Sequence, residues 1–176
     1  PNLTRLFRAR ILSSRGLVAG LGGEHERVIR LCHEALAYDP EPVERDRILQ
    51  NIGEAFRVLG YRSPARDTFL ILSCTAQEHE VQFAASLSLM LIAAEDGKLE
   101  SFEAHRRHVD RPDMPPSLRI DYLQHYSLAA RILGDEAQST CAASDAVALA
   151  AKHGINLAQF TPVRARQTLE HRQNMV

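Results

Sequence analysis

The sequence predicts an all-α fold made of helical hairpins that repeat along the chain. Four of the nine glycines form a ladder with steps of 37 residues: Gly23, Gly60, Gly97 and Gly134. A period of about 20 to 50 residues is typical of solenoid proteins, in which each unit buries its apolar face against its neighbours. Between the glycines and prolines, apolar residues recur at the three- and four-residue spacing of amphipathic helices. No segment carries the signals of a strand.

Further columns of residues follow the same ladder. Mostly small residues stand seven positions before each glycine: Gly16, Gly53, Met90 and Ser127. Mostly apolar residues stand five and twelve positions after it: Val28, Ala65, Phe102 and Ser139, then Ala35, Leu72, Val109 and Ala146. A small residue lets two helices approach closely, so we expect the two helices of each unit to meet at the first column. In the second unit this places Ala65 in a buried position against Gly53.

The second unit also carries a known pattern. The residues that fit this pattern lie in the first helix, the turn and the second helix of the unit: Leu49, Ile52, Gly53, Phe56, Leu59, Gly60, Ala65 and Phe69. They resemble the tetratricopeptide repeat (TPR), a helix-turn-helix unit with the pattern W-x2-L-G-x2-Y, then A-x3-F, then P. The resemblance implies one domain over residues 1–176, a right-handed superhelical array of about four TPR-like hairpins with a C-terminal capping helix. The units span about 8–42, 46–77, 83–114 and 120–153, and the cap about 157–173.

Prolines and glycines set the bounds of the first four helices. The segment Asp39-Pro40-Glu41-Pro42 separates the first unit from the second, and Ser63-Pro64 supplies an N-cap and a first-turn proline. Apolar residues at helical spacing, such as Val28, Cys32 and Ala35, identify the second helix. The expected helices span 3–21, 24–38, 43–59 and 64–76.

The second half of the chain follows the same plan. Residues 111–116 include three prolines and open the fourth unit. Leu118, Tyr122 and Tyr126 then mark its first helix at the expected spacing. Thr161-Pro162 marks the start of a polar helix that suits the end of a solenoid. The expected helices span 79–95, 98–109, 116–133, 136–153 and 162–173, which makes nine in all.

Composition favours a soluble, cytoplasmic protein. The chain is 45% hydrophobic and 24% charged, and it contains no apolar run near the roughly 18 residues of a membrane span. Its net charge of −1 gives no global attraction to nucleic acid or to an anionic membrane. Three widely separated cysteines, Cys32, Cys74 and Cys141, favour free thiols in a reducing compartment.

The first helices of the units predict a binding surface. One face of each is used for packing, which leaves a second stripe at positions i, i+3, i+7 and i+10 on the concave side. We expect a groove with an apolar floor and polar edges that suits an amphipathic helix or an extended peptide. The candidate groove residues are Arg10, Arg47, Gln50, Glu54, Arg57, Leu87, Leu91, Gln124, Leu128 and Arg131.

Two other interpretations of these residues stay open. Leu87 and Leu91 could instead pack against an adjacent helix, because tightly curled solenoids fill their own groove. Arg47, Glu54 and Arg57 have the spacing of an ion network within one helix.

No motif predicts catalysis, and we expect neither an enzyme nor a cofactor. The chain has no H-E-x-x-H motif, glycine-rich phosphate loop or nucleophile elbow. His105 and His108 could share a metal with Glu103 or Asp110, since imidazoles three apart on a helix face one way. Such a run of histidines and arginines is more often a solvated face, so we expect no metal site.

The N-terminal segment is basic. Its first 23 residues contain no acid but include Arg5, Arg8, Arg10 and Arg15. This composition fits an organelle presequence, or a patch that meets nucleic acid or an acidic partner domain. The register of Leu12 and Gly16 makes the segment the first helix of the array instead. The four stripes contain no aromatic residue on which RNA bases could stack, so we expect nucleic acid to be no partner of this domain.

Function follows from the resemblance. It implies a non-catalytic protein-interaction module that binds a peptide or partner protein in its concave groove, with homo-oligomers also possible. The alternative is the regulatory or sensor region of a larger bacterial transcriptional regulator. That alternative rests on residues 133–154, which are similar to helical repeats found behind DNA-binding domains.

Overall fold

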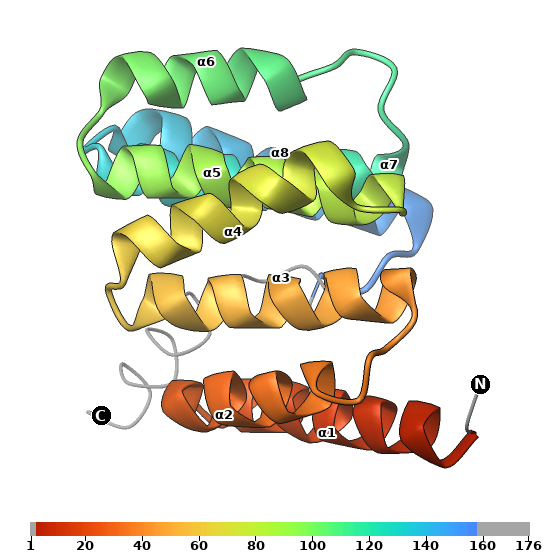
Figure 1. Ribbon diagram of the computed structural model, residues 1–176. Coiled ribbons are helices and arrows are strands. Elements are labelled where there is room, and N and C mark those ends of the chain that lie inside the picture. The colour runs from red at the N-terminus through yellow and green to blue at the C-terminus, as the bar shows by residue number, and fades with distance from the viewer. Residues whose placement is uncertain (1–2, 158–176) are drawn as a thin grey trace, which may run out of the picture. The chain divides into compact units, whose positions relative to one another are not determined.

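The computed structural model describes residues 3–157, and within them it contains eight helices and no strand (Figure 1). The all-α prediction is therefore confirmed for this part of the chain. The helices are α1 (Leu3–Leu21), α2 (His25–Leu36), α3 (Pro42–Val58), α4 (Arg62–Thr75), α5 (His79–Glu95), α6 (Leu99–Val109), α7 (Pro116–Ile132) and α8 (Glu136–His153). Each bound lies within two residues of its expected position. The capping helix expected over 162–173 lies outside the described residues.

The helix bounds repeat with the period of the glycine ladder. The helices α3, α5 and α7 begin at residues 42, 79 and 116 and end at residues 58, 95 and 132, in steps of 37. The helices α2, α4, α6 and α8 begin at residues 25, 62, 99 and 136, again in steps of 37. The described residues thus form four consecutive helix-turn-helix units on one sequence frame.

The turn within each unit is the same structure four times. The ladder glycines have φ values of 78°, 84°, 69° and 85°, a left-handed conformation that side chains with a Cβ rarely adopt. The next residue donates its amide hydrogen to the carbonyl five positions back, at 2.8 Å from Tyr61 to Phe56 and at 2.9 Å in the other three turns. This pairing is the Schellman arrangement, which satisfies carbonyls at the end of the first helix.

The small-residue column marks the place where paired helices meet. A Cβ added to Gly16 would lie 3.0 Å from the sulfur of Cys32, and one added to Gly53 would lie 3.0 Å from the ring of Phe69. In the fourth unit the equivalent Ser127 instead donates its hydroxyl hydrogen to the carbonyl of Ser139 at 2.8 Å.

One detail of the expected packing is different. Ala65 is fully buried, as expected, but the side chains that lie closest to Gly53 are Phe69 and Thr68. Phe69 is one helical turn further along α4, and its ring fills the space that the missing side chain of Gly53 leaves.

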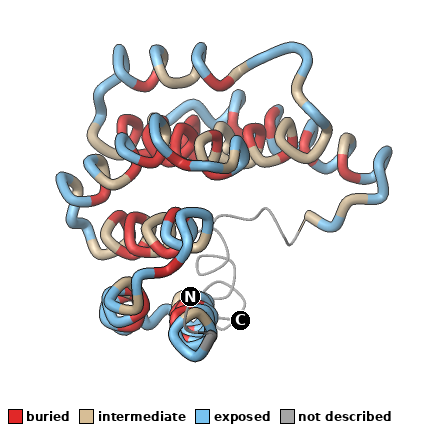
Figure 2. Tube along the Cα trace, turned by 45° about the vertical axis from the view of Figure 1, so that its right-hand side comes forward, coloured by how far each residue is buried: buried red, intermediate tan, exposed pale blue. Residues whose placement is uncertain are grey.

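The Cα positions group the chain into two compact halves, an N-terminal half, Pro1–Ser86, and a C-terminal half, Leu87–Val176, with the boundary inside α5. In the N-terminal half, α1, α2 and α3 pack against one another. Their buried side chains form one apolar cluster: Leu12, Ala19, Val28, Leu31, Cys32, Ala35, Ile48, Ile52 and Ala55. Figure 2 shows these buried positions spaced along the helices. Among the described helices, α5 alone has a long continuous run of buried residues, from 85 to 94.

In the C-terminal half, α7 and α8 pack as a pair, and a polar network joins the end of α6 to α7. Asp110 follows α6 directly and forms an ion pair with Arg119. The hydroxyl of Tyr122 donates to the second carboxylate oxygen of Asp110 at 3.1 Å. Tyr122 in turn stacks on Tyr126, with ring centroids 5.8 Å apart.

Candidate partner-binding surface

The candidate groove residues of the N-terminal half are mostly engaged in ion pairs. Arg47 forms a two-pronged pair with Glu78, with N–O distances of 2.8 to 3.1 Å. Arg57 donates from Nε to Glu54 at 2.9 Å, and its side chain is only 1% exposed. The pair within α3 is therefore Glu54 with Arg57, whereas Arg47 reaches a carboxylate on the segment before α5. Arg10 is exposed and Gln50 is half-buried.

The candidate groove residues of the C-terminal half differ in exposure. Leu87, Leu91 and Leu128 are buried, which for Leu87 and Leu91 agrees with the interpretation that they pack against other helices. Arg131 is exposed. Gln124 is half-buried, and its carbonyl oxygen Oε1 is buried with no hydrogen-bond partner in the described part of the chain. Of these five residues, Arg131 is the one that a partner can reach directly, and Gln124 is partly accessible.

The histidine pair on α6 lies beside carboxylates that are already engaged. Arg106 pairs with Glu103 at 2.9 Å and with Asp110 at 3.6 Å. Burial and the positive charge of His108 lower the pKa of His105. Among residues 3–157, no group of three or more His, Cys, Asp or Glu side chains is placed to hold a metal ion.

The cysteines within the described residues are all free thiols. Cys32 lies in the core of the first unit, and burial raises its pKa to about 11. Because the thiolate is the reactive form, Cys32 is a packing residue rather than a nucleophile.

The outer face of α1 carries an apolar stripe that the sequence analysis missed. Phe7, Ile11, Val18 and Leu21 recur at helical spacing, and each is more than half exposed. Leu17 borders the same stripe and is also exposed. Spacings of four, seven and three residues were the available signal, but the arginines between these positions hide it in the linear sequence.

Arginines flank the stripe. Arg8 and Arg15 are seven residues apart on one side of it, and Arg10 lies on the other. All three are exposed, and within residues 3–157 no carboxylate pairs with them. The helix α1 itself contains no acidic residue.

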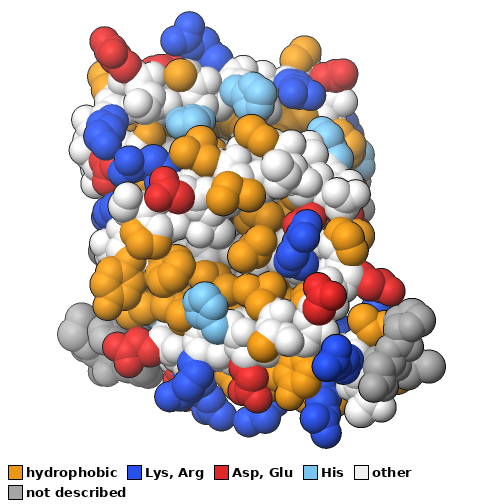
Figure 3. Space-filling view, viewed as in Figure 1, with side chains coloured by type: hydrophobic (Ala, Val, Ile, Leu, Met, Phe, Trp, Pro, Cys, Tyr) orange, Lys and Arg blue, Asp and Glu red, His pale blue; other side chains and the backbone are white. Residues whose placement is uncertain are grey.

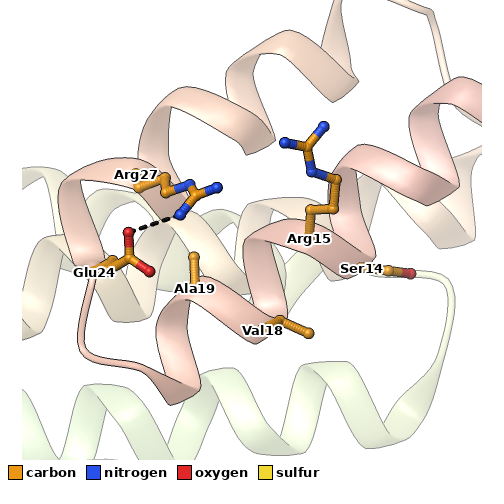
Figure 4. Close-up of a pocket in the computed structure, with 6 residues that line it drawn as sticks. All are labelled: Ser14, Arg15, Val18, Ala19, Glu24 and Arg27. Carbon is orange, nitrogen blue, oxygen red and sulfur yellow. Dashed lines mark hydrogen bonds and ion pairs between the residues drawn. The ribbon is translucent and has the colours of Figure 1, made fainter.

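A hollow of about 320 Å³ adjoins the stripe at the junction of α1 and α2 (Figure 4). It is lined by Ser14, Arg15, Val18, Ala19, Glu24 and Arg27. Figure 4 shows the guanidinium groups of Arg15 and Arg27 on the same side of the hollow, with Glu24 bonded to Arg27 at 2.9 Å. Arg15 is thus the unpaired cation of this rim.

A second apolar area is visible in Figure 3, where hydrophobic side chains gather at the level of α3. Five apolar side chains of the N-terminal half are only partly buried and pack against its core cluster: Ile29, Leu36, Tyr38, Leu49 and Phe56. Because each of these five already has apolar neighbours, they offer a partner less uncovered surface than the stripe on α1.

Comparisons with family models, with curated proteins and with solved structures gave no match. Across the described residues, no helix is both long enough and apolar enough to cross a bilayer.

Proposed function

We propose that this chain is a non-catalytic protein-interaction module. In this proposal the four hairpins form a right-handed superhelical array of the TPR type, and their first helices line a concave groove for a peptide or partner protein. The observation that carries the proposal is the repetition of one hairpin, with the same turn and the same helix bounds, in steps of 37 residues. Stacked repeats of this kind present extended surfaces rather than enclosed catalytic pockets.

The accessible groove members set the chemistry of the ligand. Arg10 and Arg131 are exposed cations, and Gln50 and Gln124 contribute amides. This set suits an extended peptide that carries a carboxylate and leaves its backbone amides free.

A peptide selected from a random display library against the immobilised chain tests this proposal. We expect Arg131→Glu to weaken its binding about tenfold or more in fluorescence anisotropy, because the reversed charge repels the ligand carboxylate. Arg30→Glu makes the same charge change on α2, at an exposed site with no ion pair among the described residues, and should bind as the parent chain does. Failure to select any saturable peptide, or equal loss in both variants, would refute the proposal.

A further inference from the structure

The centre of the exposed stripe on α1, at Ile11 and Val18, corresponds to buried positions in every later repeat. Ile11 and Val18 are 56% and 68% exposed. The residues 37, 74 and 111 positions after Ile11 are Ile48, Ala85 and Tyr122, and those after Val18 are Ala55, Ile92 and Ala129. All six are at most 3% exposed. This helix face is therefore a packing surface wherever another hairpin comes before it in the chain.

The contacts between α2 and α3 in the N-terminal half show which element covers that face. Ile48 and Ala55 of α3 belong to the apolar cluster that includes Val28, Leu31 and Ala35 of α2, and α2 packs directly on α3. A helix is thus the natural cover, and it is the second helix of the preceding hairpin.

The C-terminal half repeats the arrangement at α6 and α7 with different side chains. Tyr122 stands at the position of Ile11, and its hydroxyl bonds to Asp110 at the end of α6. The guanidinium carbon of Arg106 on α6 lies 5.9 Å from the centre of the Tyr126 ring on α7. The second helix of the preceding hairpin again supplies the contacts.

Charge narrows the kind of helix that could cover α1. Arg8, Arg10 and Arg15 border the stripe, and none of them has an ion-pair partner within residues 3–157. A second copy of α1 placed against this face would bring its own arginines close to these, and the like charges would repel one another. A helix with acidic residues on both sides of an apolar stripe would pair with them instead.

We propose that the apolar face of α1 binds an amphipathic helix of a different protein, seated on α1 as α2 is seated on α3. Apolar residues of that helix cover Ile11 and Val18, and its acidic residues meet Arg8 and Arg15 on one side and Arg10 on the other. The stripe from Phe7 to Leu21 spans roughly 21 Å, which matches about four turns of the incoming helix. The inference rests on the proposed function as an interaction module, but it uses a different surface from the groove.

Two synthetic helical peptides test this site. Both carry the same leucine stripe and are about 18 residues long, a length of roughly 27 Å that covers the stripe from Phe7 to Leu21 with a turn to spare. One has glutamates along both flanks and the other has lysines. With the full chain, we expect the glutamate peptide to bind at least tenfold more tightly than the lysine peptide in fluorescence anisotropy.

Matched variants locate the contact. Val18→Asp should weaken the glutamate peptide at least tenfold, and Arg15→Glu should weaken it while strengthening the lysine peptide. Both sites are exposed, so the folded chain tolerates the changes. Val147→Asp makes the same substitution on α8 at a site that is 55% exposed, and it should leave binding unchanged.

Several results would overturn the inference. Equal binding of the two peptides, or full binding by the Val18→Asp chain, would show that neither the charge nor the stripe of α1 recognises a helix. A dimer in analytical ultracentrifugation that Val18→Asp dissociates would assign the face to a second copy. Binding to phosphatidylserine vesicles that Val18→Asp abolishes, with no binding of either peptide, would assign it to a membrane surface. Failure of the glutamate peptide to bind, together with a display-selected peptide whose binding depends on Arg131, would overturn this inference alone and leave the proposed function standing.

Discussion

The ring of Phe69 lies against the bare backbone of Gly53, so close that a Cβ at Gly53 would come within 3.0 Å of ring atoms Cε1 and Cζ. Both residues are buried, and Phe69 is fully enclosed. Gly53 is therefore needed for space and not for backbone flexibility, since it lies inside α3.

Gly53→Ala should destabilise the fold by about 1 to 2 kcal/mol. Overpacking in a core costs about 1 to 3 kcal/mol, and the better helix propensity of alanine returns up to about 1 kcal/mol. Gly20→Ala is the matched control in α1, because its Cβ would meet only Val28 at an ordinary 3.4 Å. Urea denaturation of both variants checks the prediction, and equal stability of the two would contradict the packing described for Gly53.

Gly60→Ala should also be destabilising, but for a conformational reason. No atom lies within 4 Å of the position its Cβ would take, whereas its φ of 84° is left-handed. That conformation costs a residue with a Cβ roughly 1 to 2 kcal/mol. Gly60→Asn should lose less, because asparagine tolerates this region better.

Gly22→Ala provides the contrast in thermal denaturation. Gly22 does not have a positive φ, and its Cβ would meet no atom closer than 3.5 Å. This variant should be neutral or slightly stabilised, since alanine reduces the freedom of the unfolded chain. A Gly60→Ala protein as stable as the parent would refute the role assigned to the turn.

The frame of the fold could be predicted from the sequence because its signals are local. A glycine that ends a helix with a left-handed turn leaves the same mark in each repeat, and prolines exclude helix at the linkers. Ladder and breakers together located all eight described helices to within two residues. A superhelical TPR arrangement stays a proposal, since it depends on packing that these signals do not encode.

Exposure of the candidate site could not be predicted in the same way. Ile11 and Ile48 are the same residue type at the same repeat position, yet one is 56% exposed and the other is fully buried. The difference comes from α2, which covers α3 while no described helix takes its place on α1. Arg57 likewise reads as a surface residue in sequence but is buried beside Glu54.

The stability of the fold should fall as the pH drops below about 6.5, in part through His105. Burial and the charge of His108 lower the pKa of His105 in the folded protein, while the unfolded chain titrates near 6.5. Between these two values the unfolded state holds more protons, so acid favours unfolding. His105→Gln should reduce this dependence in urea denaturation at pH 7.5 and at lower pH, in steps of about half a unit. The same substitution at the exposed His33 is the control, and an unchanged dependence in His105→Gln would contradict the prediction.

Tyr122→Phe should lower stability at neutral pH by roughly 1 to 3 kcal/mol. The change deletes the hydrogen bond that the buried hydroxyl donates to the Asp110 carboxylate, a bond to a charged acceptor. Tyr61→Phe, on an exposed ring, should change stability by less than about 0.5 kcal/mol. Equal loss in the two variants would mean that the Asp110 network does not stabilise the junction of α6 and α7.

The same hydroxyl predicts a loss of stability at high pH. Burial, together with the negative charge of Asp110, raises the pKa of Tyr122 from 10.0 to about 12. Between these values the unfolded state has released the phenol proton while the folded state still holds it, so stability falls as the pH rises through this window. The fall should be smaller in Tyr122→Phe, and the remainder includes Tyr126, whose pKa burial also raises. Urea denaturation at pH 9 and at pH 11 measures it, and an identical fall in the parent and in Tyr122→Phe would show that Tyr122 keeps no proton by virtue of folding.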